Sequence, residues 1–212
     1  MNVLLFGASG RIGRRITDEL TERGHEVTGV SRSGEIEGVD DPNVEAVAGD
    51  ATDADDVADL AAGHDAVASA LGPAKNEEVD ILPQMADTLI TGVGRTDVDR
   101  LVWTGGAGGL SVGLDTKLIE TDEFPDDLVP LAQAHIDALE EIRDADDLEW
   151  SYVAPAARIE PGERTGEYRT AEGQLVATDD GESHISMEDF AVAFVDELES
   201  GDAIHTQLGV GY

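Results

Sequence analysis

The sequence contains no cysteine among its 212 residues. Disulfide bonds, zinc–thiolate sites, iron–sulfur clusters and thiol nucleophiles are therefore excluded. Long apolar runs are also lacking, because no window approaches the roughly 18 consecutive apolar residues that a membrane-spanning helix needs. The first residues, MNVLLFGASG, have neither the basic start nor the apolar length of a signal peptide. We therefore expect a cytoplasmic protein without a membrane partner.

Positive charge is scarce. Lys+Arg total 13 against 47 Asp+Glu, so the formal net charge is -34, and Lys75 and Lys117 are the only lysines. Such a charge repels nucleic acids and anionic membranes, so neither is expected as a partner. A lysine-poor surface with acidic residues spread along the whole chain resembles that of proteins from halophiles that accumulate salt, where the Debye length is a few ångströms. A charge that serves one particular partner is the alternative.

Short apolar runs alternate with helical patterns over most of the chain. Strands are predicted at residues 1–6, 25–31, 44–47, 64–71, 98–104, 148–153 and 204–209. Helices are predicted from the first glycine-rich segment to residue 23 and at residues 51–62, 78–93, 128–143 and 187–199. Thr52 or Asp53 is expected to cap the helix at 51–62.

This alternation predicts an α/β fold, a Rossmann-type doubly wound parallel sheet. The alternation of strand and helix patterns ends after Pro155, and glycine and proline interrupt the segments that follow. We expect one domain, in which residues 1–154 form the Rossmann core. Residues 155–212 are expected to form a small C-terminal lobe that covers the substrate.

A glycine-rich segment follows the first strand and opens the first helix: Gly7-Ala8-Ser9-Gly10-Arg11-Ile12-Gly13. Glycines at this place permit a tight turn, allow backbone N–H groups to approach a pyrophosphate, and let the helix pack closely on the strand. The spacing is G-x-x-G-x-x-G instead of G-x-G-x-x-G, yet the strand before it and the helix after it supply the required context. We predict that this segment binds the pyrophosphate of a dinucleotide. The alternative is that it is only a structural turn.

Arginines support that prediction. Arg11, Arg14 and Arg15 lie at a helix N-terminus, where the helix dipole disfavours cations. They indicate a nearby phosphate, Arg11 above all, unless acidic neighbours pair with them. At the end of the second strand Arg32 and Ser33 stand where an NAD site usually has an acidic residue, which favours NADP over NAD. Glu35 is the residue that would favour NAD.

The segments GASGRIG, VSRS, AGDATD, ASALG and WTGGAGG, in this order, resemble atypical short-chain dehydrogenases/reductases. Within that group the chain is similar over nearly its whole length to NAD(P)H-binding proteins named NADH-flavin reductases, relatives of biliverdin reductase B. The resemblance implies a binding site made of Asp50 and Ala51 beside the adenine, Ser69, Ala70, Leu71 and Gly72 along the ribose and pyrophosphate, Thr104, Gly105 and Gly106 near the nicotinamide, and Ala154, Pro155 and Ala156 on the far side.

One departure from short-chain dehydrogenases narrows the chemistry. None of Tyr152, Tyr168 and Tyr212 is followed by a lysine four residues later. In short-chain dehydrogenases such a lysine lowers the pKa of the tyrosine that transfers the proton. Its absence argues against alcohol dehydrogenase, epimerase and dehydratase reactions, which need that tyrosine. Flavin reduction needs little from the protein, because the two cofactor rings carry the chemistry. We therefore expect an NADPH-dependent reductase with flavin as a substrate instead of a bound prosthetic group. A non-catalytic NADP-binding redox sensor is the alternative.

His135 lies in the helix where a short-chain dehydrogenase would place its tyrosine, so it is a candidate proton donor, although a packed histidine would also fit. Thr104 ends the fifth strand, where open α/β sheets bind ligands. Arg158, Arg164 and Arg169 form a second basic group that predicts contact with an anionic substrate such as a flavin phosphate, with simple surface ion pairs as the alternative. The scattered histidines show no metal-binding spacing, and the oligomeric state stays open.

Overall fold

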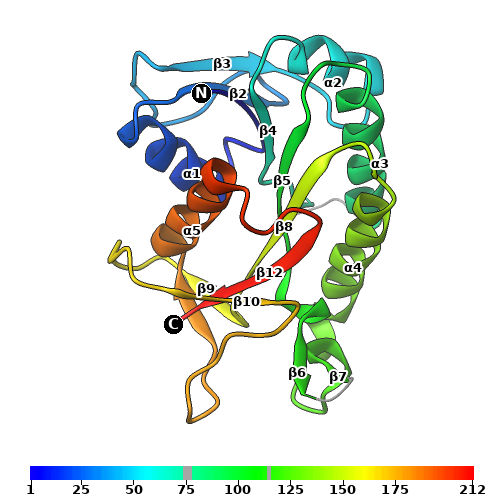
Figure 1. Cartoon of the computed structure of the whole chain (residues 1–212), viewed down its shortest axis with the longest axis vertical. Helices are drawn as coiled ribbons and strands as arrows, with labels where there is room; N and C mark the ends of the chain where they lie inside the picture. Colours follow the sequence, from blue (N-terminus) through cyan, green and yellow to red (C-terminus); the bar gives the residue numbers. More distant parts are fainter. Residues whose placement is uncertain (74–77, 114–115) are drawn as a thin grey trace.

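The computed structural model describes residues 1–73, 78–113 and 116–212, and its centre is an eight-stranded sheet (Figure 1). The strands run in the order β10-β12-β8-β5-β4-β1-β2-β3. All neighbours pair in parallel except β10 and β12, which are antiparallel. Their bounds are β1 Asn2–Phe6, β2 Glu26–Ser31, β3 Val44–Ala48, β4 Ala66–Ser69, β5 Arg100–Thr104, β8 Glu149–Pro155, β10 Arg169–Glu172 and β12 Thr206–Gly211. The predicted Rossmann-type sheet is confirmed.

In the described residues, five α-helices cover the two faces of the sheet. α1 and α5 pack together on one face, and α2, α3 and α4 lie on the other (Figure 1). They span α1 Arg11–Glu22, α2 Ala54–Ala61, α3 Ile81–Val93, α4 Val129–Arg143 and α5 Met187–Ser200. Two apolar cores result, one between the sheet and each helical layer. No helix in the described ranges is long and apolar enough to cross a membrane.

The strand order reverses between β1 and β4. From β1 the chain proceeds outward through β2 to β3, and it then returns to place β4 on the other side of β1. Such a switch point opens a crevice at the carboxyl ends of the strands, because the connections on either side diverge there. The segments that follow β1 and β4, which include the glycine-rich segment, therefore meet at this crevice.

Residues 155–212 divide between the sheet and its edge. β12 and β10 extend the central sheet beyond β8, and α5 packs on α1. Two small sheets add to the periphery, one formed by β9 Arg158–Glu160 with β11 His184–Ser186 and one by β6 Ser111–Gly113 with β7 Thr116–Lys117. The sequence pattern predicted β12. It did not predict β10 or the four short strands β6, β7, β9 and β11. Within residues 155–212, β10, α5 and β12 thus continue the core fold.

Candidate functional site

A cleft of about 860 Å³ lies at the carboxyl ends of the central strands. Segments that follow β1, β2, β3, β4, β5 and β8 line it, together with part of α4 and the connection from β7 to α4. Its size falls within the range of roughly 300–1,000 Å³ typical of ligand sites. The sequence-predicted site residues that line it are Gly7, Ser9, Gly10, Arg11, Ile12, Arg32, Asp50, Ala51, Ala70, Leu71, Gly72, Thr104, Gly105, Gly106, His135, Pro155, Ala156 and Arg158.

Two positions of the first loop require glycine, because backbone atoms approach them too closely for a side chain. Gly7 has a φ of 78°, and a Cβ on it would lie 2.5 Å from the carbonyl oxygen of Ala70. A Cβ on Gly13 would lie 2.1 Å from the carbonyl oxygen of Gly7. Gly13 does not line the cleft; instead it lets α1 pack against the loop. The loop is therefore a backbone cradle that any larger residue would fill or distort.

The cradle ends at the N-terminus of α1. Gly10 is the N-cap, and no side chain in the described residues caps the helix. The first N–H groups of a helix have no intrahelical partners and attract anions. Arg11 lines the cleft and has no ion-pair partner in residues 1–73, 78–113 and 116–212. The structure thus provides a cationic, donor-rich site of the kind that binds a phosphate.

The neighbouring arginines are engaged elsewhere. Arg14 donates to the carbonyl oxygens of Ser9 and Glu37, at 3.1 and 3.4 Å. Arg15 pairs with Glu188 of α5 at 2.7 Å. The alternative of pairing with acidic neighbours therefore holds for Arg15, and among the three arginines only Arg11 faces the cleft.

The segment after β2 brings Arg32 to the cleft beside Asp50. Two hydrogen bonds from Thr52, one from its hydroxyl and one from its backbone N–H, hold the pKa of Asp50 below its usual range, and the charge of Arg32 acts in the same direction. Ser31 lines the cleft, whereas Ser33 and Glu35 do not. Ser31 exchanges two hydrogen bonds with the backbone of Glu35 and so shapes the turn behind Arg32.

Thr104 and His135 both line the cleft. The Thr104 hydroxyl and the Nδ1 atom of His135 are buried, and neither has a hydrogen-bond partner in the described part of the chain. Burial lowers the pKa of His135 to about 4, so its ring is neutral at pH 7. The ring lies against Gly106, where a Cβ would approach it to 2.9 Å. Ser69 precedes this region, at the end of β4, and does not line the cleft.

Tyr152 supports this part of the cleft from behind. Its hydroxyl donates to the carbonyl oxygen of His135 at 2.8 Å and accepts from the N–H of Gly106 at 3.3 Å. The side chain is 1% exposed and is not part of the cleft lining. Burial raises its pKa. Tyr152 is therefore a structural link between the β5 loop and α4 instead of a proton donor to a ligand.

An apolar wall completes the cleft on the side of α4. Its members come mainly from the connection that precedes α4 and from the first turn of that helix: Leu118, Phe124, Pro125, Leu128, Leu131 and Ala132. Sequence reasoning missed this wall, because the residues lie outside the recognised motifs. Phe124-Pro125, an apolar pair within an acidic stretch, is the signal that could have indicated it.

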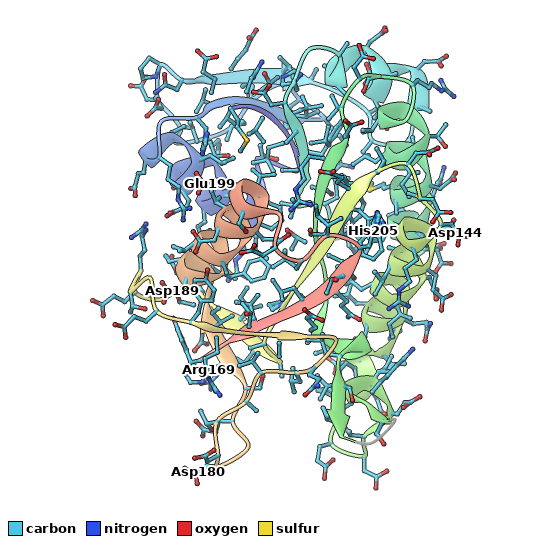
Figure 2. The ribbon with its side chains drawn as sticks, viewed as in Figure 1. Asp144, Arg169, Asp180, Asp189, Glu199 and His205 are labelled. Carbon is cyan, nitrogen blue, oxygen red and sulfur yellow. The ribbon has the colours of Figure 1, made fainter. Side chains whose placement is uncertain are left out.

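The second basic group separates into one cleft residue and two structural ones. Arg158 lines the cleft. Arg164 makes two hydrogen bonds to the buried carboxylate of Glu19, at 2.7 and 2.8 Å, and lies away from the cleft. Arg169, labelled in Figure 2 near β10, donates to the carbonyl oxygens of Ala177 and Tyr212. Of these three arginines, only Arg158 lines the cleft.

The charge of the cleft differs in sign from that of the molecule. Three arginines and two carboxylates line it among the described residues: Arg11, Arg32, Arg158, Asp50 and Glu123. This is a formal charge of +1 inside a protein of net charge -34. A locally positive cleft in an acidic protein attracts small anionic ligands. No group of three or more His, Asp or Glu side chains that could hold a metal ion occurs in the described residues.

Comparison with known proteins agrees with this geometry. The family model for NAD(P)H-binding proteins matches residues 7–200. The chain belongs to the NAD(P)H-binding family. That match runs from the glycine-rich loop to the end of α5, so it includes every residue of the cleft lining except Phe6.

Solved structures of similar proteins carry different provisional names. An exported protein from Burkholderia pseudomallei is 43% identical, with a TM-score of 0.91 and full coverage of both chains. An epimerase from Bacteroides thetaiotaomicron is 32% identical, with a TM-score of 0.91 over 100% of this chain and 96% of the other. An NADH-flavin reductase from Streptococcus pneumoniae TIGR4 is 31% identical, with a TM-score of 0.87 over 100% and 99%. All three names are provisional. Membership in the family supports a nicotinamide dinucleotide as the ligand class.

Proposed function

We propose that the protein is an NADPH-dependent reductase that transfers a hydride to a flavin-like acceptor bound as a substrate. The observation that carries this proposal is the apolar wall of Leu118, Phe124, Leu128 and Leu131, which extends the cleft beyond the Thr104–Gly106 loop. A flat aromatic acceptor needs such a surface, because burying its ring removes apolar area from water. Within the NAD(P)H-binding family we place the chain with the flavin-reductase branch related to biliverdin reductase B.

The cradle fits a dinucleotide. Gly7 and Gly10 with the N-terminus of α1 would hold the pyrophosphate, and Arg11 would neutralise it. Arg32 would bind a 2′-phosphate, which is why NADPH is preferred to NADH in this proposal. Asp50 would lie beside the adenosine. Because reduced dinucleotides are kept inside the cell, we assign the protein to the cytoplasm.

When bound, NADPH supplies a hydride from its nicotinamide ring, and the oxidised flavin takes up that hydride with one proton from water to give NADP⁺ and reduced flavin. The protein must hold the two rings in contact and exclude water from between them. Residues 155–159 and Met187, which line the cleft opposite the apolar wall, form in this proposal the substrate-facing part of residues 155–212.

His135 acts in this proposal as a neutral hydrogen-bond donor. Its Nδ1 atom is buried without a partner, and an orphaned N–H group is rarer in proteins than an orphaned acceptor. The proton of the neutral ring therefore belongs on Nε2, the nitrogen left to face the cleft. From there it donates to a carbonyl oxygen of the acceptor. Thr104, whose buried hydroxyl lacks a partner, gains one from the amide of the nicotinamide.

The two other candidate functions have less support. An epimerase or dehydratase needs a proton-transferring tyrosine, and Tyr152 is engaged with His135 and Gly106 outside the cleft lining. A redox sensor needs no space for a second ring, yet the cleft continues along the apolar wall. The sensor stays as the outcome to be tested against the reductase.

The test is acceptor-dependent oxidation of NADPH in molar KCl, with FMN, FAD and riboflavin added in turn. We expect NADPH to bind without an acceptor and to be oxidised at a rate that rises with flavin concentration. NADPH binding with no oxidation by any flavin would favour the sensor. Absence of binding by both NADPH and NADH would contradict the assignment of the cleft.

A further inference from the structure

We infer that the acceptor carries an anionic tail, a phosphate, and that Arg158 binds it at the acceptor end of the cleft. This inference rests on the proposed reductase function and names the class of flavin that the cleft prefers. It concerns the phosphorylated form, flavin mononucleotide, over riboflavin, which has the same ring system without the phosphate.

The position of Arg158 separates it from the arginines assigned to the dinucleotide. Arg32 follows β2 directly, and Arg158 begins β9, three residues after β8 ends. Four strand-to-strand steps lie between β2 and β8 in the sheet order β8-β5-β4-β1-β2. At about 4.8 Å a step this is roughly 19 Å across the cleft. Arg11, after β1, lies on the same side as Arg32, so Arg158 is the cation on the far side.

The backbone of Arg158 is held while its side chain stays available. Its N–H donates to the carbonyl oxygen of Ser183 at 3.1 Å, and β9 pairs with β11 at His184. The nearest carboxylate in the described residues, Glu160, lies at 3.8 Å, and the two side chains are 64% and 62% exposed. An exposed pair at that distance contributes little. Arg158 can therefore exchange Glu160 for a ligand oxygen at low cost.

An arginine without a close carboxylate partner is unexpected in a chain of this composition. The chain has 13 basic residues for 47 acidic ones, so an arginine has many carboxylates to choose from. Arg164, six residues later, donates two short hydrogen bonds to the carboxylate of Glu19. Arg158 instead lines the cleft at the acceptor side, beside Ala157 and Ile159. A guanidinium matches the geometry of a phosphate with two parallel hydrogen bonds.

The experiment compares FMN with riboflavin as acceptor for the wild-type protein and for Arg158→Gln, at saturating NADPH. We expect a lower KM for FMN than for riboflavin in the wild type. Arg158→Gln should raise the KM for FMN about fivefold, as expected for an exposed ion pair, and remove the preference. Arg158→Lys, which keeps the charge, should retain part of the preference.

Arg95→Gln is the matched control. Arg95 pairs with the exposed Asp55 far from the cleft lining, and its loss changes the net charge equally. Riboflavin should show no larger change with Arg158→Gln than with this control. Equal KM values for the two flavins in the wild type, or equal shifts for both in Arg158→Gln, would overturn the role of Arg158 and leave the reductase intact. Failure of every flavin to oxidise NADPH would instead contradict the proposed function.

Discussion

Arg32 and Asp50 lie at the end of the cleft where the adenosine of a dinucleotide is expected. The charge of Arg32 helps to keep the pKa of Asp50 low, which shows that the two side chains act on one another. A 2′-phosphate brought to this place would add its charge beside Arg32. NADH has a hydroxyl in the same position and would depend on Arg32 far less.

Arg32→Glu should therefore weaken NADPH binding by at least about tenfold, because a charge-assisted hydrogen bond is replaced by repulsion. NADH binding should change much less. Titration of the two dinucleotides by fluorescence measures the effect, with Arg95→Glu as the charge-matched control. An equal loss of affinity for both would contradict the assignment of the 2′-phosphate.

His135 is expected to act as a neutral side chain over a wide pH range. Because burial lowers its pKa to about 4, the ring stays neutral down to mildly acidic pH, and protonation sets in only as the pH falls toward that value. Its contribution to kcat should thus be flat between pH 5.5 and 8. His135→Ala should bind NADPH normally and lower kcat roughly tenfold, the value of one hydrogen bond.

His135→Gln, which keeps an N–H donor, should recover part of the loss in kcat. A pH profile of kcat for the three proteins distinguishes a neutral donor from an imidazolium acid. A wild-type profile that falls between pH 6 and 7, and loses that fall in His135→Ala, would show that the ring donates a proton. Unchanged turnover in His135→Ala would remove the residue from the reaction.

Single residues that follow a strand were the most predictable part of the site. Gly7 and Arg32 come directly after a recognised strand, Asp50 follows one within two residues, and Thr104 ends one. Parallel strands bring such residues to one edge of the sheet. Ser33 was placed one residue too far, because the turn after β2 directs Arg32 and not Ser33 into the cleft. Arg164 was predicted at the substrate and instead binds Glu19, which is 145 residues away in the sequence, a separation that no local pattern reports.

At the scale of elements, local signals determined what could be predicted. Asp53 caps α2 by accepting from the N–H groups of Asp55 and Asp56, and acidic residues in its first turn suit the helix dipole. Ser186 caps α5 in the same way. The predicted helix at 78–93 begins instead at Ile81, and the predicted strand at 64–71 is the shorter Ala66–Ser69. These differences lie at element ends, where capping and fraying decide the boundary.

Pairing between distant segments could not be predicted. β9 and β11 have three residues each, too few for an alternating pattern to stand out, and they pair across more than twenty residues. β10 attaches to β12 in the antiparallel sense, near the end of the chain. The connection before α4 contributes Leu118 and Phe124 to the cleft, at positions that no motif in the sequence marks. Each of these features depends on tertiary packing.

The acidic side chains of the molecule lie mainly on the outside; among the described residues, the exceptions are the buried Glu19, Asp189 and Glu197. Figure 2 shows carboxylates such as those of Asp144 and Asp180 pointing away from the body of the protein. Self-repulsion among them is screened at about 3 Å in molar salt but extends to about 30 Å at 0.01 M. We propose that this surface is an adaptation to concentrated salt.

The unfolding midpoint should accordingly fall as KCl is diluted from molar to millimolar concentration, because repulsion then favours the expanded chain. Thermal unfolding followed by circular dichroism at constant pH measures the shift. Sucrose in place of KCl is the control, since it leaves the charges unscreened. A midpoint that stays flat over this range would contradict the proposed adaptation.

The central claim is that one cleft holds a nicotinamide dinucleotide and an aromatic acceptor in contact. Anaerobic mixing of the protein with NADPH and FMN tests it most directly, with the nicotinamide and flavin absorbances followed together. We predict that both bands decay at one rate and in equal molar amounts, faster than without protein. A protein that binds NADPH and leaves both bands unchanged would contradict the account.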